Sequence, residues 1–163
     1  MNTKDGQEHG SAMKLEMQEG QVHDPSINMD RLVNRAWAEI DLDRIAGNVA
    51  EIRRVVGPRT EIMAVVKADG YGHGVKETVR TMLDAGATRL AVSMLDEAIQ
   101  LRHLGIDVPI LVLGFTDPKR ASEILRHGIT QTVFSHPLAE ALSVAAQKAG
   151  KPARIHVKID TGM

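Results

Sequence analysis

The chain has 163 residues, of which 43% are hydrophobic and 25% charged, and its formal net charge at pH 7 is -1. This composition is typical of a globular domain, and the near-zero charge excludes the strong basic field of a nucleic-acid-binding protein. The sequence has no cysteine, which excludes disulfides and thiolate metal sites and favours a cytoplasmic protein. No apolar run approaches the ~18 residues of a membrane span, so we do not expect a membrane as a partner. The near-zero charge likewise leads us to expect no nucleic-acid partner.

The N-terminal residues differ in character from the rest of the chain. Residues 1–33 are polar and lack the apolar stretch of a secretory signal, so we interpret them as a disordered leader. Residues 34–163 carry regular hydrophobic patterning and are expected to form the folded domain.

In this domain, short apolar runs alternate with segments of helical periodicity. Asp41 or Asp43 is expected to cap the first helix, which Gly57 ends, and Asp96 is expected to cap the third helix. The expected strands are residues 36–43, 61–67, 89–95, 108–115, 129–134 and 153–160, with one helix after each strand except the last.

Strands that alternate with single helices predict βαβ units and a parallel sheet. Five such strands follow the first helix, and they fit a doubly wound sheet and a (β/α)8 barrel equally well. The glycine spacing of a dinucleotide-binding turn and a phosphate-binding P-loop are both absent from the sequence. A complete barrel needs at least ~200 residues, so a barrel here would be partial.

Residues 64–74 read AVVKADGYGHG and place Lys67 at the carboxyl end of an apolar strand. In parallel α/β folds this end faces the ligand site, where a partly desolvated amine can bond to an aldehyde or to pyridoxal phosphate. The glycines let the backbone bend closely around a ligand, and Tyr71 offers a hydroxyl donor. The alternative is a lysine that only extends into water beside a connecting turn.

The same residues resemble the cofactor-lysine motif of the alanine racemases, which are fold-type III pyridoxal-phosphate enzymes. Residues 35–49 (RAWAEIDLDRIAGNV), 90–102 (LAVSMLDEAIQLR) and 156–163 (HVKIDTGM) are similar to further segments of that family in the expected order. The resemblance implies an α/β fold, a pyridoxal-phosphate-binding (β/α)8 TIM-type barrel truncated to about five strands over residues 34–163. It also implies a C-terminal β-domain that these residues do not include.

The resemblance assigns roles to three side chains. Lys67 is expected to bind pyridoxal 5'-phosphate as a Schiff base and then to act as the catalytic acid and base on one face of the substrate. Tyr71 corresponds to the tyrosine that hydrogen-bonds the cofactor phosphate. Lys158 corresponds to a lysine that is often carbamylated in this family. The histidines have no partners at ligand spacing, so we expect no metal site.

The implied activity is interconversion of L-alanine and D-alanine, which supplies D-alanine for peptidoglycan, by a homodimer. The family's second base is a tyrosine of the C-terminal domain, so we expect this chain to be an incomplete and poorly active fragment. The alternatives are a related racemase of another amino acid such as serine, a non-catalytic pyridoxal-phosphate-binding barrel protein, and an inactive truncated polypeptide.

Overall fold

The computed structural model describes residues 12–15 and 38–162. Five parallel strands form one sheet in which neighbours in space are also neighbours in sequence. A doubly wound sheet reverses its strand order at a switch point, whereas the wall of a barrel does not. The structure therefore confirms a TIM-type wall of five strands. These are β3 (Met63–Val65), β4 (Arg89–Val92), β5 (Ile110–Val112), β6 (Thr130–Val133) and β7 (Arg154–Val157).

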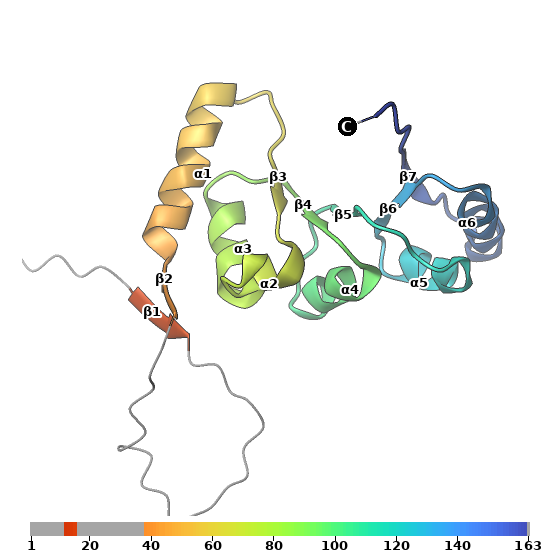
Figure 1. Ribbon diagram of the computed structural model, residues 1–163, viewed down its shortest axis with the longest axis horizontal. Coiled ribbons are helices and arrows are strands. Elements are labelled where there is room, and N and C mark those ends of the chain that lie inside the picture. The colour runs from red at the N-terminus through yellow and green to blue at the C-terminus, as the bar shows by residue number, and fades with distance from the viewer. Residues whose placement is uncertain (1–11, 16–37, 163) are drawn as a thin grey trace, which may run out of the picture.

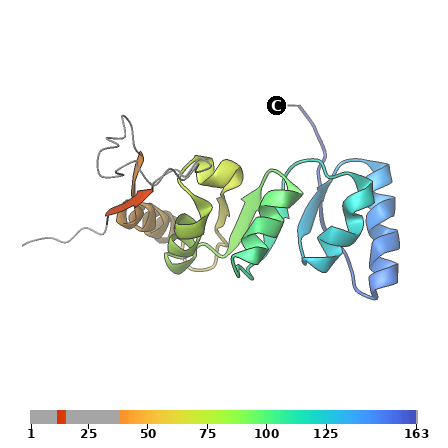
Figure 2. The ribbon, with the colours of Figure 1, turned by 90° about the horizontal axis from the view of Figure 1, so that it is seen from below.

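The helices that follow the strands lie along one face of this sheet (Figure 1). Viewed from that side, α4 and α5 stand in front of the strands, α6 packs beside α5 at one end of the molecule, and α1 packs against α3 at the other (Figure 2). The helical elements are α1 (Leu42–Val56), α2 (Lys67–Tyr71), α3 (Val75–Asp84), α4 (Leu95–His103), the 3-10 turn η2 (Pro118–Arg120), α5 (Ala121–Arg126) and α6 (His136–Ala149).

A separate pair of antiparallel strands precedes α1, formed by β1 (Ala12–Leu15) and β2 (Ala38–Asp41). Strand β1 falls within the expected leader, so four of those residues form a strand. The other leader residues lie outside the described part of the chain, and the disordered leader stays a prediction. At the end of β2, the Asp41 carboxylate accepts a hydrogen bond from the Arg44 backbone N–H at 3.0 Å, which confirms one of the two expected caps.

The hydrophobic core lies between the sheet and the helices. Leu90 and Ile110 on the strands and Ile124 and Leu138 on the helices have at most 1% of their surface exposed. Because side chains alternate along a strand, Val65 and Leu113 and their equivalents lie on the opposite face. Val65 and Leu113 are 40% and 39% exposed, whereas Ala91 and Leu111 on the same face are buried, so this second face is only partly covered.

The cap of helix α4 differs from the expectation. Asp96 is expected to cap this helix, but the helix begins at Leu95 with Met94 in the cap position, and the Glu97 side chain bonds back to the backbone just before it. The Glu97 carboxylate accepts hydrogen bonds from the backbone N–H groups of Ser93 at 2.7 Å and Met94 at 2.9 Å. The expected Asp96 cap is wrong because the side chain of Asp96 is turned toward the next helix.

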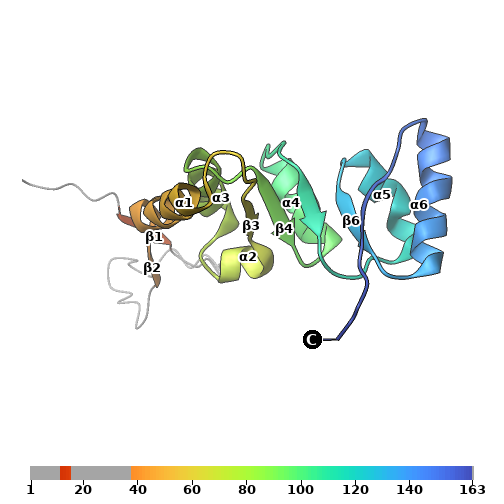
Figure 3. The same cartoon turned by 90° about the horizontal axis from the view of Figure 1, so that it is seen from above.

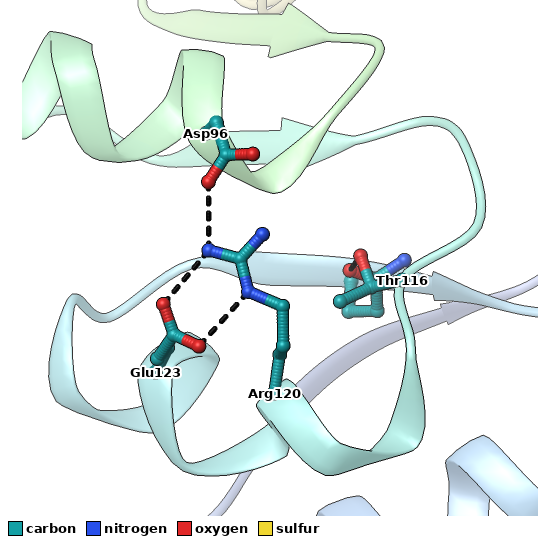
Figure 4. A network of polar contacts seen from close by, with 5 residues as sticks. Asp96, Thr116, Arg120 and Glu123 are labelled. Atoms are coloured by element: carbon teal, nitrogen blue, oxygen red, sulfur yellow. Dashed lines mark hydrogen bonds and ion pairs between the residues drawn. The ribbon is translucent and has the colours of Figure 1, made fainter.

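That side chain takes part in a three-residue ionic network (Figure 4). The Arg120 guanidinium donates to Asp96 at 2.7 Å and to the two carboxylate oxygens of Glu123 at 2.9 and 2.8 Å. These hydrogen bonds lower the pKa of both carboxyls and raise the pKa of Arg120. The network joins the first turns of α4 and α5.

Replacing Arg120 with methionine removes the cation that lowers the pKa of Asp96 and Glu123. A carboxyl with a lowered pKa stabilises the fold above its unfolded pKa, here near 3.8 and 4.5, and loses that effect as the pH falls through its folded value. Urea unfolding between about pH 5 and pH 3 should therefore show a steeper loss of stability for the wild-type chain than for Arg120→Met. Lys119→Met, which removes a neighbouring exposed cation, should keep the wild-type slope. Equal slopes for the wild type and Arg120→Met would contradict this account.

Candidate functional site

Lys67 lies two residues after the end of β3, with Val66 between them, and starts the short turn α2. Its side chain is partly exposed, and its Nζ lies 5.8 Å from the centre of the Tyr71 ring, within the range of a cation–π contact. The Tyr71 side chain is 59% exposed. The structure thus brings two of the three expected site residues together at the carboxyl edge of the sheet.

The backbone between these two side chains has an uncommon conformation. Ala68, Asp69 and Tyr71 have φ values of 51°, 52° and 56°, and Gly70 has 64°, so α2 is a left-handed turn. For residues other than glycine this conformation costs about 1–2 kcal/mol each. A turn of this kind persists only if the surrounding structure holds it.

Several hydrogen bonds hold the turn after its first residue. The Gly72 N–H donates to the Ala68 carbonyl at 3.0 Å, and the Gly74 N–H donates to the Asp69 carbonyl at 2.9 Å. The Asp69 carboxylate accepts from the Val75 N–H at 2.9 Å, which joins the turn to the start of α3. The side chain of Asp69 thus caps the next helix from within the left-handed segment.

The entry to the turn is held by Glu97, which lies on α4. One Glu97 oxygen accepts the Ala68 N–H at 2.6 Å, while the other accepts the two amides at the start of its own helix. Glu97 is not among the site residues expected from the sequence. A glutamate at the third helical position is the available signal, but the pattern is recognised by a polar cap residue, and Met94 stands there instead.

Lys158 lies just after β7, where its backbone N–H donates to the Val133 carbonyl at 2.9 Å. Its side chain is exposed. Strands β3 and β7 are the two outer strands of the sheet, so Lys158 and Lys67 stand at opposite ends of it. The chain leaves β7 on the same side of the sheet as α2, which places both lysines at the carboxyl edge (Figure 3).

Between these ends, the carboxyl edge is closely packed around Gly114. A β-carbon added there would lie 2.5 Å from the Ser93 carbonyl oxygen, and the Gly114 N–H donates to that same oxygen at 3.0 Å. The buried amide of Gln131 donates to the Gly114 carbonyl at 2.9 Å and accepts from the Thr116 hydroxyl at 2.8 Å. The segments after β4 and β5 are thereby fixed to each other.

The described residues hold neither a group of three or more acidic or histidine side chains suited to a metal nor a helix able to cross a membrane. A groove of about 780 Å³ lies between α5 and α6, where Leu125 and Val144 line it. Neither Lys67 nor Tyr71 lines this groove, so we place the candidate site at the carboxyl edge on its chemistry and its position in the fold.

The fold and the site together define a class: parallel α/β barrel walls that present an amine at the carboxyl end of a strand. A family model, "Alanine racemase, N-terminal domain", matches residues 40–163. The chain belongs to this family.

Curated and solved relatives agree with that family. The chain is similar to alanine racemases of Desulforamulus reducens (52% identity over 127 residues, 78% of this chain and 34% of the relative) and Clostridium perfringens (50% over 135 residues, 83% and 35%). Among solved structures it resembles alanine racemase of Clostridium difficile (TM-score 0.71, 37% identity, 75% of this chain and 32% of that one). It also resembles histidine racemase of Leuconostoc mesenteroides (TM-score 0.69, 34% identity, 75% and 32%). The chain spans about a third of the length of these relatives.

Replacing Gly114 with alanine should move the segments after β4 and β5 apart, because the added methyl group meets the Ser93 carbonyl. We expect a loss of about 1–3 kcal/mol in the free energy of unfolding. The matched control is Gly47→Ala within α1, where no atom beyond the helix's own neighbouring backbone lies within 4 Å of the added carbon. It should stabilise the chain by up to about 1 kcal/mol. Urea unfolding of both variants checks this, and equal effects would contradict the close approach.

Proposed function

We propose that these residues form the cofactor-binding half-barrel of a pyridoxal-phosphate-dependent amino-acid racemase that acts on alanine. The observation that carries the proposal is the position of Lys67, whose partly exposed amine stands at the carboxyl edge beside Tyr71. Among the described residues its amine has no ion-pair partner, so it is available to an aldehyde. These residues fit pyridoxal phosphate, which carries an aldehyde and a phosphate on one ring.

Lys67 would hold the cofactor covalently, and the hydroxyl of Tyr71 would donate to its phosphate. When bound, the cofactor withdraws electrons and makes the α-hydrogen of an amino acid removable. Once the amino group of the substrate has replaced it on the cofactor, the freed amine of Lys67 would serve as the proton acceptor and donor on one face of the α-carbon. Lys158, at the far end of the same edge, is proposed as the carbamylated lysine, which would exchange its positive charge for a negative one.

Inversion at a carbon centre needs a second proton-transfer group on the opposite face. The resemblance assigns this group to a tyrosine, and the sequence contains only Tyr71, which is assigned to the phosphate. We therefore propose that the second group comes from another part of the enzyme, which acts as a homodimer. The proposal places the reaction in the cytoplasm, where it supplies D-alanine for peptidoglycan.

The second candidate is a racemase of another amino acid with the same cofactor. The similarity to histidine racemase favours it, because that enzyme matches this chain nearly as well in fold and identity as the alanine racemase of Clostridium difficile. The cofactor half is thus compatible with more than one substrate.

The cofactor proposal predicts selective labelling of Lys67. The chain is mixed with one equivalent of pyridoxal phosphate and treated with borohydride, which fixes the bond between cofactor and lysine, and the peptides are mapped by mass spectrometry. The pyridoxyl group should be found on Lys67 and should be lost in Lys67→Arg. Lys76→Arg removes a nearby exposed amine on α3 and should keep the label. A label spread over several lysines, or one that persists in Lys67→Arg, would refute the proposal.

The proposed preference for alanine predicts that the α-hydrogen of alanine exchanges with solvent faster than that of other amino acids. Removal of the α-proton by Lys67 in D2O leaves deuterium in the amino acid, and this step needs a base on only one face. The cofactor-loaded chain should introduce deuterium into racemic alanine faster than into racemic serine or histidine, as measured by NMR. Lys67→Arg is the control and should introduce none. Faster exchange into histidine or serine would favour the second candidate.

A further inference from the structure

The left-handed turn after Lys67 contains a restraint that comes from outside the turn. Three backbone amides bond to the carboxylate of Glu97, one from Ala68 and two from Ser93 and Met94, the residues directly before α4. Ala68 is the residue directly after Lys67, and it is also the first with a positive φ. The Glu97 side chain therefore restrains the backbone where it enters the left-handed turn, in addition to the backbone hydrogen bond from the Gly70 N–H to the Val66 carbonyl at 3.0 Å.

The geometry requires a carboxylate in particular. All three groups that face Glu97 are N–H donors, and an ionised carboxylate accepts at both of its oxygens. Hydrogen bonds to a charged acceptor are also shorter and stronger than those between neutral groups, in agreement with the distance of 2.6 Å to the Ala68 nitrogen. An amide side chain in this place would have to direct its own NH2 group at one of the donors.

The bonds also divide between the two carboxylate oxygens in an informative way. One oxygen of Glu97 accepts the Ser93 and Met94 amides and forms the helix cap, while the other accepts only Ala68. A residue that served only as a helix cap would need the first oxygen alone. The second oxygen joins the segment after β4 to the segment after β3, at the residue next to the lysine.

We propose that Glu97 is a positioning residue, which holds the backbone at Ala68 and thereby directs the amine of Lys67 toward the carboxyl edge. The proposal rests on the proposed function only in what Lys67 binds; the restraint on the backbone is independent of any cofactor. Glu97 itself does not touch the reacting atoms.

The test uses Glu97→Gln in the whole chain. Glutamine keeps the size of the side chain, and its single acceptor oxygen satisfies the two cap amides best, which leaves its NH2 group opposite the Ala68 N–H. Glu97→Asp is a second variant that breaks the same bond by shortening the side chain, and it replaces the first if Glu97→Gln does not fold. Glu123→Gln is the matched control, because Glu123 also lies in the first turn of a helix but bonds to Arg120.

Two quantities are measured: the hydrogen-exchange rate of the Ala68 amide by NMR without cofactor, and the rate at which pyridoxal phosphate bonds to Lys67, followed by visible absorption. In Glu97→Gln we expect amide exchange to rise about tenfold and the bonding rate to fall by a similar factor, the effect of losing one hydrogen bond to a charged acceptor. Glu123→Gln should change neither quantity.

Unchanged exchange at Ala68 in the Glu97 variants would overturn the proposal. Faster exchange with an unchanged bonding rate would also overturn it, since Glu97 would then be a structural cap alone. If the wild-type chain does not bond the cofactor at Lys67, the proposed function fails, and the exchange rate at Ala68 still decides whether Glu97 holds the backbone beside the lysine.

Discussion

All five strands of the sheet run in one direction, and this constraint gives the two edges of the wall different chemical groups. Helices that follow parallel strands begin at the carboxyl edge with free N–H groups and end at the amino edge with free carbonyl groups. At the amino edge, Arg102 donates to the carbonyls of His127 and Val108, each at 2.9 Å, and burial lowers its pKa. At the carboxyl edge, Glu97 accepts amides from two segments. At the amino edge a cationic side chain donates hydrogen bonds to several carbonyl groups, and at the carboxyl edge a carboxylate accepts hydrogen bonds from several amides.

The edge that is rich in N–H groups is the one that presents Lys67. A ligand with an aldehyde and a negatively charged phosphate suits this edge, because amides and helix N-termini favour negative charge. The left-handed turn is the feature that connects the sheet to this chemistry. It brings the ring of Tyr71 close to the amine of Lys67, the first residue of the turn. Hydrogen bonds from the turn and its flanks to the carboxylates of Asp69 and Glu97 hold its conformation. The site therefore rests on the packing of neighbouring units and not on the glycine-rich segment alone.

Much of this architecture could be predicted from the sequence. Hydrophobic periodicity gave the strands and helices in the right order, and the glycines around Tyr71 indicated a turn with an unusual backbone. Periodicity could not choose between an open sheet and a barrel wall, because that choice depends on which strands pair, and the observed strand order settles it. The role of Glu97 could not be predicted either, since its third partner, Ala68, lies 29 residues earlier in the chain. The expected cap at Asp96 failed for a related reason: Arg120, on the next helix, pairs with that carboxylate.

The wall buries its helix-facing side and leaves apolar side chains such as Val65 and Leu113 on the other side. In a closed eight-stranded barrel this second side is the packed interior. We propose that the carboxyl edge of this wall holds pyridoxal phosphate on Lys67, and a crystal structure of the borohydride-reduced complex would show whether it does. The pyridoxyl ring should be bonded to Lys67 at the carboxyl edge, with its phosphate within hydrogen-bonding distance of the Tyr71 hydroxyl. A ring bonded to another lysine, or a phosphate directed away from Tyr71, would be incompatible with this site.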